Sequence, residues 1–354
     1  MDTKHIIYKN FNNKNKKLNK KKLIDFLKFK ILIKKYPLLK SLTNSYNYSF
    51  KKKYLLNLKK YNEFNLIGMG GSILGTQAIY DFLNHKIKKK FFFYNNLQNL
   101  KITNSNKKRL NIIVSKSGNT LETLSNLNLI LTKQKRNKNL IITENKDNIL
   151  RAMANKLRSD VIDHKNYIGG RYSVLSEVGM LPVELLGLNE RKFKRLNYLI
   201  KNKYFLNQLI YNVNFIFNCV SKGKKNSVIL NYDESSNNLF KWYQQLTAES
   251  LGKDNKGIFP IISSMPKDNH SLLQLYLDGP KNNFFTFFGI LNEKTNNLSN
   301  KNLFDKFSIL KNKNLNQIIK AQRQATQTVF KRKKIPFRSF EILSKNEGTV
   351  GELF

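Results

Sequence analysis

The sequence predicts an α/β protein made of two tandem α/β/α sandwiches with parallel sheets and a basic helical N-terminal extension. Three observations support this fold class. The chain has 354 residues, which suits two domains of roughly 100–200 residues each. Hydrophobic residues make up 40% of it, so most of the chain is expected to fold. Short apolar runs also alternate with segments of helical periodicity, the order typical of parallel strands joined by right-handed crossovers.

The predicted domain boundaries follow changes in composition. We assign residues 1–60 to a basic helical segment, 61–190 to the first sandwich and 191–354 to the second. In the first segment, which is rich in Lys and Asn, four apolar residues recur at helical spacing: Leu23, Ile24, Leu27 and Ile31. They predict a basic amphipathic helix. We favour its packing on the domain that follows, and binding to a membrane surface is the alternative.

The strands are predicted from apolar runs bounded by polar or helical sequence. Those of the first sandwich are Phe64–Ile67, Phe91–Tyr94, Leu110–Val114 and Leu140–Thr143. Those of the second are Ser227–Leu230, Phe259–Ile262, Phe284–Ile290 and Phe337–Ile342. Helical stretches of the second sandwich are expected near 236–250, 270–278 and 313–330, and helices near 174–215 join the two halves. The alternation therefore recurs in both halves of the chain.

The charge balance is strongly basic, with 64 Lys and Arg against 23 Asp and Glu and a net charge of +41. A nucleic-acid-binding surface is one explanation. However, 10 of these cations are Arg, which leaves 64 − 10 = 54 Lys, and they are spread along the whole chain. Dedicated nucleic-acid sites more often use Arg forks or aromatic platforms. We therefore favour a drift toward A/T-rich codons and expect no nucleic-acid partner.

The sequence also disfavours a disulfide-stapled secreted protein, a zinc protein and a membrane-spanning protein. Cys219 is the only cysteine, so an internal disulfide is excluded, and four His with one Cys give no zinc-ligand spacing. No uncharged apolar run reaches 18 residues, the length that indicates a membrane span. The N-terminus is polar, unlike a signal peptide. We expect a cytoplasmic protein with no bound metal and no membrane partner.

A glycine-rich loop, Gly68–Ser72, follows the first predicted strand. It is not a dinucleotide fingerprint, because Ile73 stands where the third glycine would be. It is not a nucleoside triphosphate loop either, because Thr76 and Gln77 occupy the required Lys-Ser/Thr positions. The turn offers free N–H groups and the Ser72 hydroxyl to an anion. A tight structural turn explains the same residues equally well.

A second loop concentrates hydroxyl groups between a strand and a helix. Ser115, Lys116, Ser117, Gly118 and Thr120 fall within six residues. A phosphate monoester needs several donors that converge from one side, and hydroxyls with helix N-terminal amides supply them. A helix cap would need only one hydroxyl. We therefore predict that this loop binds a phosphate.

Five ordered segments resemble the glucose-6-phosphate isomerase family, whose domains are of the sugar-phosphate isomerase (SIS) type, with a flavodoxin-like fold. The segments are Ile67–Ser72, Ser115–Thr120, Asn166–Ser173, Gln245–Lys253 and Asn269–Ser271. The similarity runs from about residue 62 to the end of the chain. It implies interconversion of glucose 6-phosphate and fructose 6-phosphate through a cis-enediolate, in glycolysis and gluconeogenesis. No redox or metal cofactor is required for this reaction.

The resemblance also implies roles for individual residues. Glu249 is the proton carrier between C1 and C2, and it is expected near a helix end at Gly252, where a carboxylate is electrostatically unfavourable. Arg171 stabilises the enediolate without exchanging a proton. Gln245, one helical turn before Glu249, contacts sugar hydroxyls. The remaining substrate-binding residues are Gly71, Ser72, Ser115, Lys116, Ser117 and Thr120. Tyr172 and Trp242 are interpreted as packing residues.

His270 is the third predicted catalytic residue. It follows Asp268 and Asn269, which are good N-caps for a helix through Leu272, Leu273 and Leu275. A histidine at a helix N-terminus tends to stay neutral, as ring opening requires. In the family dimer the equivalent histidine helps to open the sugar ring and comes from the partner subunit. The resemblance therefore implies a homodimer.

The sequence departs from the family pattern at one point. The family continues past the region that matches Glu347–Phe354 into a helix with a Tyr-Asp-Gln segment and a lysine that assists ring opening. No Tyr-Asp-Gln segment occurs among the 354 residues. Either the sequence ends early or the protein has lost this helix. A sugar-phosphate-binding protein with weak or no catalysis is therefore the alternative to the isomerase.

Overall fold

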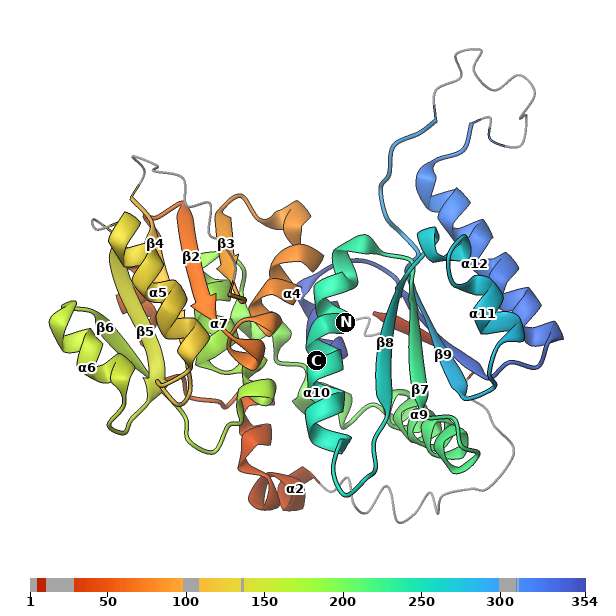
Figure 1. The fold of residues 1–354 in the computed structure, drawn as a ribbon, viewed down its shortest axis with the longest axis horizontal. Helices are drawn as coiled ribbons and strands as arrows, with labels where there is room; N and C mark the ends of the chain where they lie inside the picture. The colour runs from red at the N-terminus through yellow and green to blue at the C-terminus, as the bar shows by residue number, and fades with distance from the viewer. Residues whose placement is uncertain (1–4, 11–28, 98–107, 135–136, 299–309, 311) are drawn as a thin grey trace.

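The computed structural model describes residues 5–10, 29–97, 108–134, 137–298, 310 and 312–354. These residues form two five-stranded sheets, each flanked by helices (Figure 1). Every strand pair but one is parallel. The predicted α/β class with parallel sheets is confirmed.

The first sheet is entirely parallel and has the order β3-β2-β4-β5-β6. Its strands are β2 Glu63–Gly68, β3 Lys90–Tyr94, β4 Leu110–Val114, β5 Lys138–Glu144 and β6 Asp160–His164. Helices α5 (Leu121–Lys133) and α6 (Ile149–Lys156) cover one face, and α4 (Leu74–Phe82) and α7 (Glu177–Leu185) cover the other. Because both faces are covered, the central strands are mainly apolar on both sides, and their buried Asn65, Asn111 and Asn139 hydrogen-bond in series. This is why the sequence shows them as mainly hydrophobic runs.

The second sheet has the order β1-β10-β9-β7-β8. Its strands are β1 Ile6–Lys9, β7 Asn226–Asn231, β8 Phe259–Ser264, β9 Asn283–Ile290 and β10 Phe337–Ile342. Helices α11 (Leu273–Asp278) and α12 (Leu315–Arg332) pack on one face, and α9 (Lys203–Ser221) and α10 (Asn237–Leu251) on the other (Figure 1). The four strands predicted for this half are confirmed.

Shorter elements complete the fold. The remaining α-helices are α2 Phe29–Lys35, α3 Lys52–Leu58, α8 Leu196–Leu199 and α13 Glu347–Leu353. The 3-10 helices are η1 Pro37–Leu42, η2 Gly70–Ser72, η3 Asn84–Lys86, η4 Gly170–Leu175, η5 Glu190–Phe193, η6 Glu234–Ser236 and η7 Lys267–Asn269.

The N-terminal extension differs from the wholly helical segment that the sequence predicts. Residues 6–9 form β1, which pairs antiparallel with β10, and Ile6 is buried against the second sheet. The strand is only four residues long and its partner is more than 320 residues away, so no local pattern reveals it. Leu23, Ile24 and Leu27 of the predicted amphipathic helix lie outside the described residues.

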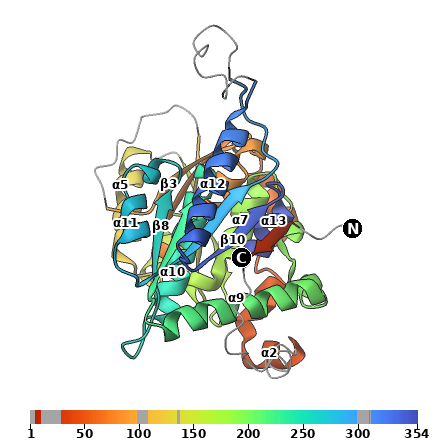
Figure 2. The same ribbon diagram turned by 90° about the vertical axis from the view of Figure 1, so that its right-hand side faces the viewer.

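The two ends of the described chain meet at the second sheet. The Leu343 amide, just after β10, donates to the His5 carbonyl oxygen at 3.0 Å. The His5 Nε2 atom lies 3.9 Å from Glu352 Oε1. Figure 2 shows α13 beside the N-terminal strand.

One hydrophobic core spans both sheets. Leu66 and Val114 of the first sheet belong to the same cluster of buried residues as Ile229 and Phe288 of the second. Helices α4 and α10 pack against each other between the sheets (Figure 1). The two halves are therefore joined by apolar packing rather than by a flexible linker.

The described residues contain no helix with both the length and the hydrophobicity of a membrane span. Within the same residues, no three His, Cys, Asp or Glu side chains lie close enough together to hold a metal ion.

Candidate active site

The two loops singled out from the sequence lie side by side at the carboxyl ends of adjacent strands. Gly68, the last residue of β2, is in register with Val114, the last residue of β4. The chain leaves β2 for β3 on one side and then crosses to β4 on the other. Such a reversal of strand order is where open parallel sheets bind their ligands. The topology therefore favours a ligand at these two loops.

Hydrogen bonds within the hydroxyl loop, Ser115–Thr120, fix its shape and leave the start of α5 uncapped. Ser115 and Thr120 form a hydrogen bond between their hydroxyl oxygens at 2.9 Å, and the Gly118 amide donates to Ser115 Oγ at 3.2 Å. Thr120 is the N-cap residue of α5, yet its side chain makes no capping bond. The alternative that the hydroxyls serve as a helix cap is therefore not realised. The first-turn amides of α5 remain available for an anion.

Gly118 is required by the geometry of this loop. Its φ of +71° lies in the left-handed region. A Cβ atom there would lie 2.0 Å from Asn148 Oδ1. Asn148 caps α6 by accepting from the Arg151 amide, so the loop is packed against the start of a second helix. Ser117, by contrast, is exposed.

Lys116 connects the hydroxyl loop to the segment that carries Arg171. Its Nζ atom donates to the Asn166 carbonyl oxygen at 2.8 Å and lies 3.2 Å from Glu144 Oε1. Although burial opposes it, hydrogen bonds from Lys146 and Lys116 lower the pKa of Glu144. The Lys116 ammonium is thus paired within the protein, and its role as a substrate ligand remains a prediction.

Three of the predicted residues meet around one carboxylate. Arg171, in η4, donates from Nη1 to Glu249 Oε2 at 3.1 Å, and Gln245 Nε2 donates to Glu249 Oε1 at 2.8 Å. Glu249 lies at the end of α10, which stops at Gly252 as predicted. Its side chain is 48% exposed, against 23% for Arg171. The carboxylate is therefore oriented at both oxygens and still open to a ligand.

Ser250 and Tyr172 fix the guanidinium group from the other side. Arg171 donates from Nε to Ser250 Oγ at 2.9 Å, and the Tyr172 hydroxyl lies 2.9 Å from the same oxygen. The guanidinium carbon is 4.7 Å from the centre of the Tyr172 ring. Against the opposing effect of burial, the bonds with Ser250 and Arg171 lower the pKa of Tyr172.

Sequence reasoning missed the role of these two residues. Tyr172 is more than a packing residue, and Ser250 was not singled out at all. The available signal was their adjacency to Arg171 and Glu249. Trp242, by contrast, is buried and packs on the Phe354 ring at 4.5 Å, which agrees with the packing role predicted for it.

The glycine loop brings this cluster against the first sheet. A Cβ atom on Gly71 would lie 2.3 Å from the Gly170 carbonyl group, and one on Gly70 would lie 2.7 Å from Gln245 Nε2. Ser173 Oγ donates to the Gly71 carbonyl oxygen at 3.2 Å. The loop therefore serves as the tight structural turn that the sequence left open. A role for Gly71 and Ser72 in substrate binding remains a prediction.

His270 is not part of the cluster within one chain. It is exposed and lies just after η7. In the described part of the chain, no hydrogen bond or ion pair links its side chain to Glu249, Arg171 or the hydroxyl loop.

The predicted helix start at Asp268 and Asn269 is wrong. Helix α11 begins at Leu273, and its N-cap residue Leu272 makes no side-chain bond. The Asp268 carboxylate instead accepts from Ser263 Oγ, the Ser264 amide and Ser271 Oγ. These bonds hold the turn that presents His270, so the expected effect of a helix N-terminus on this histidine does not apply.

Comparison with known proteins gives a consistent result. Residues 56–258 match the family model of phosphoglucose isomerase. The chain is similar to a glucose-6-phosphate isomerase of Methanocaldococcus jannaschii, at 33% identity over 84% of this chain and 78% of that protein. It is also similar to one of Campylobacter jejuni, at 31% identity over 74% and 69%. A crystal structure of a glucose-6-phosphate isomerase from Chlamydia trachomatis has the same fold, with a TM-score of 0.73, 16% identity and coverage of 99% and 81%.

Proposed function

The chain belongs to the phosphoglucose isomerase family, and we propose that it interconverts glucose 6-phosphate and fructose 6-phosphate through a cis-enediolate, as an enzyme of glycolysis and gluconeogenesis. The observation that carries this proposal is the carboxylate of Glu249. It accepts hydrogen bonds from Arg171 and Gln245, and Gln245 lies against Gly70 of the glycine loop that follows β2. A single oriented carboxylate is what a proton transfer between two neighbouring carbons requires.

The phosphate group is bound first, at the hydroxyl loop. Ser115, Ser117 and Thr120 supply hydroxyl donors, and the uncapped start of α5 supplies amide donors. This arrangement holds the far end of the hexose phosphate, so that C1 and C2 reach the carboxylate. Binding energy spent on the non-reacting phosphate thereby orients the reacting carbons.

Glu249 then moves the proton. In the aldose-to-ketose direction it takes the proton from C2, and the freed electron pair forms the C1–C2 double bond of the enediolate. The carboxyl returns its proton to C1, while a hydroxyl proton moves from O2 to O1. Arg171 lies 3.1 Å from Glu249, so its positive charge stabilises the enediolate oxygens without giving up a proton.

Gln245 orients the base and offers a site for a sugar hydroxyl. Its amide nitrogen donates to Glu249, while its side-chain oxygen is buried and has no hydrogen-bond partner among the described residues. A buried acceptor without a donor is uncommon in a folded protein. A rotation of the Gln245 amide that exposes this oxygen would let a sugar hydroxyl supply the missing donor.

The site lies between the two proposed domains, residues 61–190 and 191–354. Arg171 and the hydroxyl loop come from the first range, and Gln245 and Glu249 from the second. Ring opening needs one more group, and His270 is exposed and unconnected to Glu249 within one chain. We therefore propose a homodimer in which a second copy supplies His270. As a glycolytic enzyme, the protein would act in the cytoplasm.

The direct test is conversion of fructose 6-phosphate to glucose 6-phosphate by the purified chain. We expect turnover, and we expect Glu249→Gln to lower kcat by about 10²–10⁴-fold while fructose 6-phosphate still binds. A sugar-phosphate-binding protein without catalysis would show binding but no turnover in either form. Binding without turnover by the unmodified chain would therefore overturn the enzymatic proposal.

A further inference from the structure

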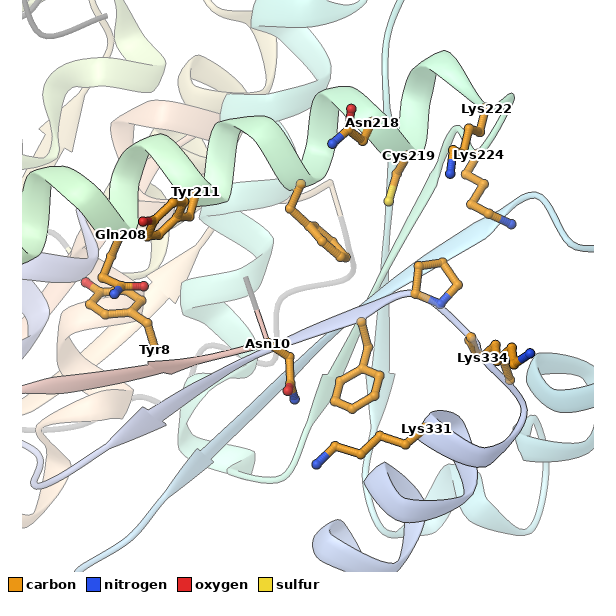
Figure 3. A pocket seen from close by; sticks show the side chains of 14 residues that line it. Tyr8, Asn10, Gln208, Tyr211, Asn218, Cys219, Lys222, Lys224, Lys331 and Lys334 are labelled. Carbon is orange, nitrogen blue, oxygen red and sulfur yellow. The ribbon is translucent and has the colours of Figure 1, made fainter. Parts of the chain in front are cut away.

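A hollow lies at the edge of the second sheet that β1 forms, away from Glu249. The cavity measures about 660 Å³ and is formed by α9, by β1, and by the connection from α12 to β10 (Figure 3). Its volume is within the range of small-molecule sites. Glu249 is carried by α10, which packs on β8, and β8 is the edge strand opposite β1. The hollow and the proposed isomerase centre are therefore separate.

Positive charge gathers around this hollow without any negative charge in its lining. Lys222 and Lys224 follow the end of α9, and Lys331 and Lys334 lie at the end of α12 and just after it. These are 4 of the 14 lining residues, none of which is Asp or Glu. Lysine makes up 54 of the 354 residues of the chain, so its share of the lining is about twice its share of the chain. The uniform spread of lysines along the sequence does not account for this concentration.

Most of these ammonium groups have no partner in the part of the chain that the structure describes. Lys224 Nζ donates to the Lys281 carbonyl oxygen. Within the described residues, the side chains of Lys222, Lys331 and Lys334 make no hydrogen bond or ion pair. Like charges that face one hollow repel each other. A bound polyanion would remove this repulsion.

The opposite end of the hollow is aromatic and polar rather than cationic. In Figure 3, Tyr8, Tyr211 and Gln208 lie at one end, while Lys222, Lys224 and Lys334 lie at the other. The Tyr8 ring already packs on Tyr204 and Phe340, whereas the exposed Tyr211 ring provides a face on which a planar base can stack. The Gln208 amide can both donate and accept hydrogen bonds. The two ends therefore suit the two parts of a nucleotide.

We propose that this hollow binds a nucleoside polyphosphate, with the phosphate chain among Lys222, Lys224, Lys331 and Lys334 and the base near Tyr8 and Tyr211. The site is separate from the hexose phosphate site, so both ligands bind at once. Lysine ammonium groups bind phosphate as point charges, without the fixed fork of arginine. The phosphate chain is therefore held by charge, and the base adds selectivity.

The test is calorimetric titration of the full chain with ATP in magnesium-free buffer that contains saturating fructose 6-phosphate. The pocket variant is Lys222→Gln/Lys331→Gln. The matched control is Lys53→Gln/Lys88→Gln, which removes the same charge from two exposed lysines of the first half of the chain. Isomerase turnover of both variants shows that they are folded. Inorganic tripolyphosphate and adenosine are titrated as the two separate parts of the ligand.

We expect ATP to bind saturably in the presence of the hexose phosphate. The pocket variant should weaken this binding by about tenfold or more, since two charge-assisted contacts are lost, and the control by less than about twofold. ATP should bind more tightly than tripolyphosphate, and adenosine most weakly. Absence of saturable binding, displacement of ATP by fructose 6-phosphate, or equal weakening in both variants would overturn the site. Equal affinity for ATP and tripolyphosphate would overturn the assignment of the base.

Discussion

The contact between Gly71 and Gly170 allows a stringent test of the site geometry. In the variant Gly71→Ala, the new Cβ would lie 2.3 Å from the carbonyl carbon and oxygen of Gly170 and 2.6 Å from the Arg171 amide nitrogen. An ordinary contact begins at 3.4 Å, so the two backbones must separate by about 3.4 − 2.3 = 1.1 Å. Both neighbours are main-chain atoms, which have no rotamer into which they could retreat. The strain therefore falls on η4 and on the position of Arg171.

Two magnitudes follow from this displacement. Overpacking of this kind lowers the free energy of unfolding by about 1–3 kcal/mol. A misplacement of about 1 Å at a catalytic group lowers the rate by about 10²-fold. We therefore expect Gly71→Ala to lose about two orders of magnitude in kcat for fructose 6-phosphate, with a lower urea midpoint. Coupled detection of glucose 6-phosphate and urea denaturation followed by circular dichroism measure the two effects.

Gly170 provides the matched control. A Cβ atom on Gly170 meets no other atom within 4 Å, and its φ does not lie in the left-handed region. Gly170→Ala should therefore keep both activity and stability close to those of the unmodified chain. If Gly71→Ala retained full kcat, or if both variants lost activity equally, the packing of η2 against η4 would not be what places Arg171.

Three further predictions concern other contacts. Ser250→Ala removes the acceptor of Arg171 Nε and the partner of the Tyr172 hydroxyl. In steady-state assays, kcat should therefore fall about tenfold with little change in KM. Ser250→Thr keeps a hydroxyl and should restore most of the lost kcat. Tyr46→Phe removes the hydroxyl that donates to both oxygens of the buried Glu177 carboxylate and should lower the free energy of unfolding by about 1–3 kcal/mol, whereas no change in the urea midpoint would contradict this. Burial lowers the pKa of His164. Below about pH 6.5 the unfolded chain therefore binds a proton that the folded chain resists, and the free energy of unfolding decreases as the pH is lowered. His164→Asn should reduce that loss, and equal pH dependence of unfolding in both proteins would refute the assignment.

The sequence predicted the elements whose pattern is local. The β4 strand, Leu110–Val114, is buried on both faces and is apolar at every position but Asn111. The β6 strand, Asp160–His164, lies at the edge of its sheet and has only two apolar residues, Val161 and Ile162, between polar ones, so it was missed. The β1 strand was missed because its partner is at the far end of the chain. Edge strands carry a weak hydrophobic signal because only part of their surface is covered.

In the candidate site too, local sequence patterns were predicted and contacts between distant residues were missed. Motif resemblance indicated Arg171, Gln245 and Glu249, and the fold brings these three into contact. It gave no indication of the Arg171–Ser250 bond, which joins residues 79 positions apart. The expected capping role of Asp268 failed because Ser263 and Ser271 occupy its carboxylate. Local rules cannot anticipate such bonds, since the competing partners are set by tertiary packing.

The buried cluster shared by the two sheets has a consequence for how the protein moves and melts. Leu66 and Phe288 belong to one packed interior, and solvent cannot enter between the halves without exposing the apolar surfaces of both. A swing of one half away from the other is therefore not expected when a ligand binds at Glu249. Heat or urea should disrupt the whole molecule in a single cooperative step rather than one half at a time.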